Sequence, residues 1–201
     1  MGSQWGRDSA YVRAMQEGYR SRAAYKLIEI QNRYHLIREH DNVVDLGAAP
    51  GSWLQVIRAV TRGTVLGIDL SPIAPLDGVK TMVADFTDPA LPGQVRSLVG
   101  TVNVVVSDAA PRLSGHKSYD QARAMALGED ALAFTRSVLK PGGNFLVKAF
   151  QGEDFSHLLG DIRYHFLSAR TFRSRATRKG SSEIYIIAKN FVGTHEAERP
   201  L

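Results

Sequence analysis

The sequence of 201 residues contains no cysteine. This absence excludes disulfide bonds, thiolate nucleophiles and cysteine metal sites, and it leaves the redox compartment undecided. No apolar run approaches the roughly 20 residues that span a bilayer. The first residues, MGSQWGRDSAYVR, have no apolar segment typical of a secretory signal. We therefore expect a cytoplasmic protein with no membrane partner.

Two nucleotide-binding motifs are also missing. The dinucleotide fingerprint G-x-G-x-x-G does not occur, because the glycine-rich loop reads Gly47-Ala-Ala-Pro-Gly51. Pro50 would also remove an amide from a pyrophosphate cradle. There is no G-x-x-x-x-G-K-[ST] loop for a nucleoside triphosphate, and no His/Asp/Glu group has metal-ligand spacing. We expect neither a nicotinamide cofactor nor a metal.

The length suits one α/β domain with a full core. Hydrophobic residues make up 44% of the chain, as in a globular protein. We predict a single domain over residues 1–201. It consists of a basic helical arm at about 7–38, a catalytic sheet domain at about 41–191 and a short tail at 192–201.

Positive charge is concentrated in two stretches, within a formal net charge of +5. Residues 7–38 contain seven basic and three acidic residues, and residues 168–182 contain five basic residues and no acid. Such clusters are typical of a surface that binds a phosphate backbone. They are equally typical of two solvated basic surfaces. Charge alone leaves both readings open.

Strands and helices alternate along the chain. This alternation predicts a doubly wound, mostly parallel sheet with helices on both faces and right-handed crossovers. Only a basic loop separates the last two strands, so we expect them to pair antiparallel. The expected strands are 41–46, 64–70, 80–86, 103–108, 144–150, 168–173 and 183–189, and the expected helices are 20–34, 53–60, 91–99, 119–139 and 155–166.

In such a sheet, ligands bind beyond the carboxyl ends of the strands. The first strand ends in the small residues of Gly47–Gly51, which let a ligand approach the backbone. Asp69, at the end of the second strand, can accept hydrogen bonds from ribose hydroxyls, and Asp85 can reach an adenine amino group. The alternative is a tight turn with two helix-capping aspartates. An adenosine cofactor without phosphates fits best, which indicates S-adenosylmethionine.

Four further polar residues fall where this fold gathers side chains, although they lie far apart in sequence. They are two lysines, Lys26 and Lys148, and two carboxylates, Asp108 and Glu183. Lysines and carboxylates over a cofactor loop indicate group transfer to a hydroxyl. The alternative for each residue taken alone is an ordinary ion pair at the end of a strand.

Six motifs make the chain recognisable: YRSRAAYKL (19–27), VVDLGAAPGSW (43–53), GIDL (67–70), SDAAP (107–111), LKPGGNFLVKAF (139–150) and RKGSSEIY (178–185). With them the chain resembles the FtsJ/RrmJ family of S-adenosylmethionine-dependent ribose 2'-O-methyltransferases, which act on large-subunit ribosomal RNA. The resemblance covers residues 8–191. It departs from the family at Ser52, where members commonly have glycine, and a small serine should have little consequence.

The resemblance implies a Rossmann-like, seven-stranded sheet with an inserted antiparallel last strand. It implies methylation of a ribose 2'-hydroxyl, of a uridine, in large-subunit (23S) ribosomal RNA within the large ribosomal subunit. It also implies that Lys26, Asp108, Lys148 and Glu183 form a catalytic tetrad. The cofactor-binding residues that we predict are Asp45, Gly47, Gly51, Ser52, Trp53, Asp69, Leu70, Asp85, Phe86 and Asp108.

The chemistry assigns roles within the tetrad. A ribose hydroxyl is a poor nucleophile until its proton is removed, so a base must lie near it. We choose Lys148 as the proton acceptor, because burial and a neighbouring cation such as Lys26 favour a neutral lysine. Asp108 and Glu183 should orient Lys148, and Lys26 can steady the developing alkoxide or a flanking phosphate. Which lysine carries the proton stays open.

RNA contacts are expected from basic residues around this pocket, where they would bind phosphates. Nothing in the sequence demands a protein partner. Two other functions stay possible: 2'-O-methylation of tRNA, and a catalytically silent RNA-binding factor for ribosome assembly. The predicted RNA-binding residues are Arg20, Arg22, Arg112, Lys117, Arg175, Arg178 and Lys179.

Overall fold

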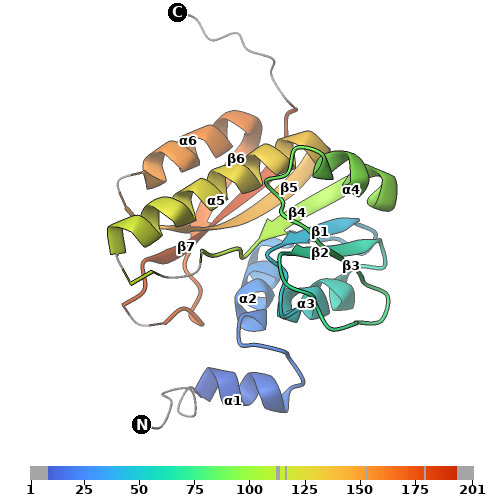
Figure 1. Ribbon diagram of the computed structural model, residues 1–201, viewed down its shortest axis with the longest axis horizontal. Coiled ribbons are helices and arrows are strands. Elements are labelled where there is room, and N and C mark those ends of the chain that lie inside the picture. The colour runs from blue at the N-terminus through green and yellow to red at the C-terminus, as the bar shows by residue number, and fades with distance from the viewer. Residues whose placement is uncertain (1–8, 112–113, 116, 153, 179, 194–201) are drawn as a thin grey trace, which may run out of the picture.

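The computed structural model describes residues 9–193, apart from 112–113, 116, 153 and 179. Helices and strands alternate through most of this part of the chain (Figure 1). The helices are α1 (Ser9–Gln16), α2 (Ala24–Tyr34), α3 (Ser52–Val60), α4 (Leu91–Val99), α5 (Lys117–Val138) and α6 (Phe155–His165). The strands are β1 (Val43–Leu46), β2 (Val65–Asp69), β3 (Lys80–Val83), β4 (Val102–Ser107), β5 (Leu139–Phe150), β6 (Phe166–Phe172) and β7 (Glu183–Phe191).

The described strands form one seven-stranded sheet in the order β3-β2-β1-β4-β5-β7-β6. Strands β1 to β5 pair parallel with one another. Strand β7 is inserted between β5 and β6 and runs antiparallel to both. The Rossmann-like fold class and the antiparallel last strand are therefore confirmed.

Helices cover both faces of the sheet, as predicted (Figure 1). Val44 and Leu46 pack with side chains from α4, α5 and α6, whereas Val43 packs with side chains from α2 and α3. Successive side chains of a strand point to opposite faces, so β1 contributes to both core clusters. All four residues of β1 are buried, as expected for a central parallel strand.

The N-terminal arm differs from the single helix expected over residues 20–34. It consists of α1 and α2, joined by residues 17–23. The backbone N–H of Arg20 donates to the side chain of Gln55 in α3, at 2.9 Å. The side chain of Gln55 donates in turn to the carbonyl of Gly18, also at 2.9 Å. These contacts tie the joining segment to α3, which explains why α2 begins only at Ala24.

Among the strand boundaries, the start of β5 and the end of β3 differ most from the prediction. Strand β5 begins at Leu139 rather than at residue 144, because Leu139 already pairs with Val102 and the register then shifts before Val104. Strand β3 ends at Val83 rather than at residue 86. Beyond it, Asp85 accepts hydrogen bonds from the N–H and hydroxyl of Thr87, which turns the chain.

Candidate active site

The glycine-rich loop between β1 and α3 lies against the end of β4. Gly47 has a φ of +72°, and a Cβ at that position would lie 2.7 Å from the Cα of Ala109. Gly51 has a φ of +102° and caps the N-terminus of α3. A side chain is therefore strained at both positions, and only glycine allows the loop to turn so tightly beside residue 109. The N-terminus of α3 follows directly, as in ligand-binding loops of this fold.

Asp45 carries a buried carboxyl that has no partner. The residue is fully buried in β1, and neither carboxyl oxygen accepts a hydrogen bond within the described part of the protein. Burial raises the pKa of Asp45 well above its ordinary value, and the negative charges of Asp108 and Asp69 raise it further. A buried polar group without a partner is costly. Burial therefore favours the neutral form of this carboxyl, and contact of Asp45 with a cofactor stays a prediction.

The residues that follow β2 and β3 combine turn formation with an open apolar surface. The carboxylate of Asp69 accepts the N–H groups of Ala49, at 3.0 Å, and Ser71, at 2.8 Å. An ionised carboxylate has about four acceptor sites, so two stay available for ribose hydroxyls. Leu70 is 70% exposed directly after β2. These features fit the sugar and base of S-adenosylmethionine. The alternative expected Asp69 and Asp85 to cap helices, and the structure has both accepting N–H groups of the turns that follow their strands.

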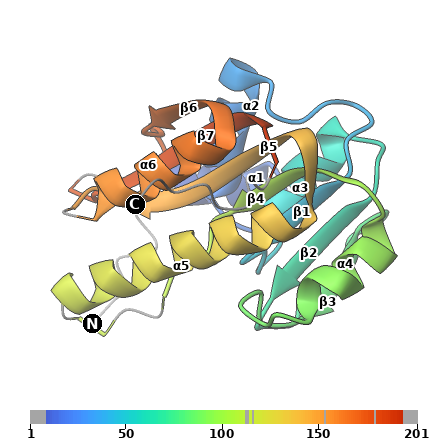
Figure 2. The same ribbon diagram turned by 90° about the horizontal axis from the view of Figure 1, so that it is seen from above.

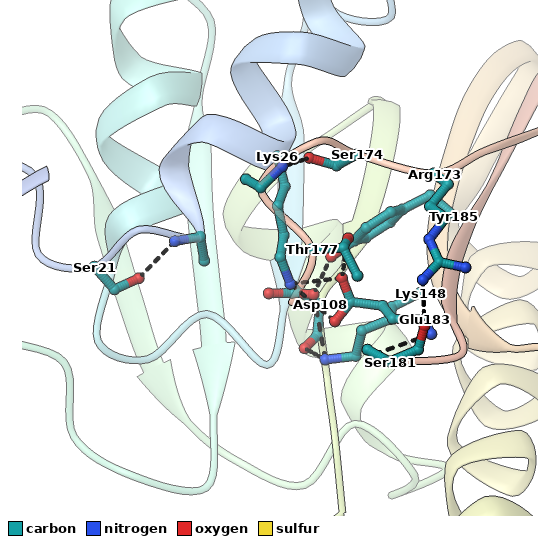
Figure 3. Close-up of polar contacts among 12 residues, drawn as sticks. Ser21, Lys26, Asp108, Lys148, Arg173, Ser174, Thr177, Ser181, Glu183 and Tyr185 are labelled. Carbon is teal, nitrogen blue, oxygen red and sulfur yellow. Dashed lines mark hydrogen bonds and ion pairs between the residues drawn. The ribbon is translucent and has the colours of Figure 1, made fainter. Parts of the chain in front are cut away.

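The structure brings the four predicted catalytic residues together as two ion pairs (Figure 3). Lys148 Nζ lies 3.2 Å from Asp108 Oδ1 and donates to the Asp108 carbonyl at 2.6 Å. Lys26 Nζ lies 2.7 Å and 2.9 Å from the two carboxylate oxygens of Glu183. The expectation that Glu183 orients Lys148 is corrected, because Glu183 holds Lys26 instead.

Sheet geometry explains these pairings. Lys148 lies near the carboxyl end of β5, and Asp108 directly follows the neighbouring parallel strand β4. Glu183 opens β7 and pairs with Phe150, the last residue of β5. Lys26 comes from α2, which packs over the same end of β7. The side chains of both lysines are almost completely buried, so each needs the carboxylate beside it.

Tyr185 is a functional candidate that sequence reasoning missed. Its hydroxyl donates to Asp108 Oδ1 at 2.7 Å, and its ring lies 5.7 Å from Lys26 Nζ (Figure 3). Burial raises the pKa of Tyr185 well above its ordinary value, with the charges of Asp108 and Glu183 acting in the same direction. The hydroxyl therefore stays a donor. The sequence held a signal, because residues two apart on a strand share a face, and Tyr185 follows Glu183 by two.

A cavity of about 650 Å³ opens beside the two ion pairs. Besides Glu183, the described wall contains one more acidic residue, Asp120, whose carboxylate accepts hydrogen bonds from the N–H groups of Ser114 and Gly115. The described wall contains four basic residues and two acidic ones, so positive charge is in excess, which suits an anionic substrate with a reactive hydroxyl. Its described wall includes Lys26, Lys148, Glu183, Arg22 and Arg178.

One arginine, Arg20, anchors the N-terminal arm beside the glycine-rich loop. Arg20 donates to the carbonyls of Pro50 at 3.0 Å, Ala74 at 2.8 Å and Pro75 at 2.7 Å. Its guanidinium thus joins the glycine-rich loop to the segment after β2. We predicted Arg20 as an RNA contact, and this residue is engaged within the protein instead.

Two predicted cofactor residues make contacts that hold α2 in place. The hydroxyl of Ser52 accepts a hydrogen bond from that of Ser21, at 2.8 Å. The indole N–H of Trp53 donates to the carbonyl of Ala23 at 2.8 Å, and its ring lies 5.9 Å from that of Tyr185. Trp53 is buried in the core, so its observed role is to support α2 and hence Lys26.

The remaining predicted RNA contacts divide into three groups. Arg22 and Arg178 line the cavity. Arg175 is exposed in the loop before β7, where its N–H donates to Glu29. Arg112 and Lys179 lie outside the described residues, and so does the side chain of Lys117 at the start of α5. Contact with RNA stays a prediction for all of them.

Two negative findings apply to the described residues alone. They contain no group of three or more histidines or acidic residues that could hold a metal ion. None of their helices is long and apolar enough to cross a membrane.

A Rossmann-like sheet with an inserted antiparallel strand, a glycine-rich loop and a buried lysine–carboxylate tetrad defines a class of methyltransferases. A family profile described as FtsJ-like methyltransferase matches residues 19–191. This match covers most of the chain, which therefore belongs to the FtsJ-like methyltransferase family.

Relatives named ribosomal RNA large subunit methyltransferase E are similar along the whole chain. The protein of Methanoculleus marisnigri is 64% identical, with 100% of both chains covered. That of Methanoregula boonei is 63% identical over 96% of this chain and 100% of its own. A solved structure from Plasmodium falciparum, described as a ribosomal RNA methyltransferase, has a TM-score of 0.78 at 28% identity and covers 88% of this chain and 100% of its own.

Proposed function

We propose that this protein transfers the methyl group of S-adenosylmethionine to a ribose 2'-hydroxyl of large-subunit (23S) ribosomal RNA, at a uridine, in the cytoplasm. The observation that carries the proposal is the meeting of two buried lysine–carboxylate pairs at the wall of a cationic cavity. The names of the relatives support ribosomal RNA as the substrate. The large ribosomal subunit is the partner that we propose.

The residues at the carboxyl ends of β1 and β2 fit the cofactor. S-adenosylmethionine supplies a methyl group on a positively charged sulfur, which leaves as a neutral thioether. The loop Gly47–Gly51 and Asp69 would hold the cofactor. Asp108, next to Asp45, would place negative charge near the sulfur.

Lys148 is the residue that we assign as proton acceptor. The form of Lys148 that reacts is the neutral amine. As the ribose oxygen bonds to the methyl carbon and the carbon–sulfur bond breaks, the ribose proton passes to Lys148 Nζ. The Asp108 carbonyl and carboxylate hold this nitrogen in place, at 2.6 Å and 3.2 Å. The resulting ammonium is then stabilised by Asp108, so the charge formed in the reaction is compensated at once.

Lys26 differs, because Glu183 binds it with both carboxylate oxygens. We assign it to electrostatic support of the ribose oxygen or of a flanking phosphate. Arg22 and Arg178, in the wall of the same cavity, would bind phosphates on either side of the reacting nucleotide.

The test measures labelled methyl transfer to separate pools of large ribosomal subunits, free ribosomal RNA and tRNA, with Lys148→Ala as the control. Label in the large-subunit pool that the variant does not transfer would support the proposal. Alkaline hydrolysis locates the methyl group, since a 2'-O-methyl ribose leaves an alkali-stable dinucleotide and a methylated base does not. Label only in tRNA would replace the substrate, and no label in any pool would favour an RNA-binding factor without catalysis.

A further inference from the structure

A second cavity, of about 680 Å³, lies along the edge strand β6 and is separate from the catalytic cavity. We call it the edge groove. The end of α2 and the end of α6 flank it, and β6 forms its floor at the edge of the sheet, beside α6 (Figure 2). Its wall consists of Arg33, Tyr34, Arg163, Phe166, Leu167, Ser168, Ala169, Arg170 and Thr171.

The edge groove is positively charged. Arg33, Arg163 and Arg170 are exposed, and none of the described residues that line the groove is acidic. Lys189 adds a further amine beneath the floor, because it pairs with Ser168 across β6 and β7. Burial lowers the pKa of Lys189, and the nearby charge of Arg38 lowers it further. Such a concentration of cations attracts anions.

One of these cations is held by aromatic rings. The guanidinium of Arg33 lies 5.7 Å from the ring centres of both Tyr34 and Phe172. The two rings pack edge to face, also with centres 5.7 Å apart. A guanidinium held beside two rings loses little freedom when it binds a phosphate, which favours recognition of phosphate groups.

The edge groove points toward the catalytic residues. Phe172, at the end of β6, pairs with Tyr185 in β7, whose hydroxyl binds the catalytic Asp108. From Phe166 to Phe172 the strand spans about 20 Å at its usual rise. A nucleic acid strand whose reacting ribose lies at the tetrad could therefore continue along β6 past Arg170 to Arg163.

We propose that the edge groove binds the phosphodiester backbone of the RNA substrate away from the methylated nucleotide. This inference rests on the proposed function and extends it, because it adds a contact surface outside the catalytic cavity. A peptide strand added to β6 is the rival occupant. The exposed Arg170 on the edge strand opposes such pairing, and the lack of acids among the described lining residues favours a polyanion. Arg33 and Arg163 also lie in the last turns of their helices, where a positive charge interacts favourably with the helix dipole. That role does not apply to Arg170, which lies on a strand.

The experiment compares the double variant Arg163→Gln/Arg170→Gln with wild type and with a matched control, Arg62→Gln/Lys80→Gln. The control also removes two exposed cations, one of them on β3 at the opposite edge of the sheet. Affinity for a transcript of the large-subunit ribosomal RNA is measured over a series of salt concentrations. Losing two phosphate contacts should lower the slope of log K against log salt by about 1.4 and weaken binding roughly tenfold at low salt.

Two further measurements localise the effect. Binding of S-adenosylmethionine and the thermal unfolding midpoint should match wild type in both double variants. A short RNA that carries only the acceptor nucleotide and its nearest neighbours should bind the groove variant and wild type equally, because it does not reach the edge groove.

The outcomes separate the inference from the proposed function. Wild-type methylation of ribosomal RNA, with unchanged RNA affinity and salt slope in the groove variant, would overturn the edge groove as an RNA surface. Equal losses in the groove variant and the control would also overturn it, since any surface charge would then suffice. Absence of methyl transfer by the wild-type protein would instead count against the proposed function.

Discussion

The two lysine–carboxylate pairs of the candidate active site are held by different parts of the fold. Lys148 lies on β5, and Asp108 directly follows the neighbouring parallel strand β4. Lys26 and Glu183 join the N-terminal arm to the inserted strand β7. The first pair is therefore as rigid as the sheet, whereas the second exists only when the arm is docked.

The neighbours of each pair sharpen this difference. Asp108 also accepts the hydroxyl of the buried Tyr185 and lies close to the unpartnered Asp45. Glu183 instead accepts a hydrogen bond from Thr177, at 3.0 Å, in the loop before β7. The sheet pair is thus linked to buried side chains of β1 and β7, and the arm pair to the basic loop before β7. Proton removal fits the first pair, and substrate placement fits the second.

Removing the lysine of the sheet pair should have the largest effect. Lys148→Ala deletes the proposed proton acceptor, so kcat should fall about 10³-fold while S-adenosylmethionine still binds. Single-turnover methyl transfer and cofactor titration measure the two quantities. Lys140→Ala is the matched control, because Lys140 is an exposed lysine of the same strand. A near-normal kcat in Lys148→Ala would contradict the assignment of proton removal to the Lys148–Asp108 pair.

Neutralising the carboxylate of the arm pair should have a smaller effect. Glu183→Gln keeps the shape of the side chain and can still accept hydrogen bonds from Lys26 and Thr177. We expect kcat to fall about tenfold, as for one electrostatic contact of roughly 1.4 kcal/mol. Glu39→Gln, which breaks an exposed pair with Arg62, serves as the control. A loss as large as that of Lys148→Ala would show that both pairs act on the proton.

Tyr185→Phe tests how firmly the sheet pair is positioned. The substitution keeps the ring packed against Trp53 and removes the hydroxyl that donates to Asp108. We expect the free energy of unfolding to fall by about 1 kcal/mol, and kcat to fall roughly fivefold if the bond is fully used in the transition state. Urea unfolding and kcat are compared with those of Tyr164→Phe, at an exposed tyrosine. An unchanged kcat with reduced stability would mean that Tyr185 has only a structural role.

The smallest effect concerns Asp45, the carboxyl beside the sheet pair. Its pKa is raised by burial, so the folded protein retains this proton at a pH where the unfolded chain, with a pKa of about 3.9, has released it. The free energy of unfolding therefore falls as the pH rises from about 4 toward the raised pKa. Asp45→Asn should flatten this decline in urea unfolding measured without cofactor. The same slope in both proteins would contradict the burial argument.

Much of the fold followed from patterns along the chain. The helix expected at residues 91–99 matches α4, where Pro92 opens the helix and Gly100 follows its end. The buried strands β1 and β4 were recognisable as runs of β-branched residues. The arm was harder to predict, because its break at residues 17–23 depends on hydrogen bonds to Gln55 in α3. Nothing in the local sequence specifies that contact.

By itself, the sequence determined the order of the elements, the glycine-rich loop and the four polar residues of the tetrad. These features depend on local periodicity, on turn chemistry and on the kinds of side chain present. Only the tertiary structure decided that Lys26 pairs with Glu183, 157 positions away, that Arg20 is engaged by three carbonyls, and that Tyr185 binds Asp108. The physical reason is that the partner of a buried charge is set by which strands and helices meet, and this choice is made when the sheet assembles.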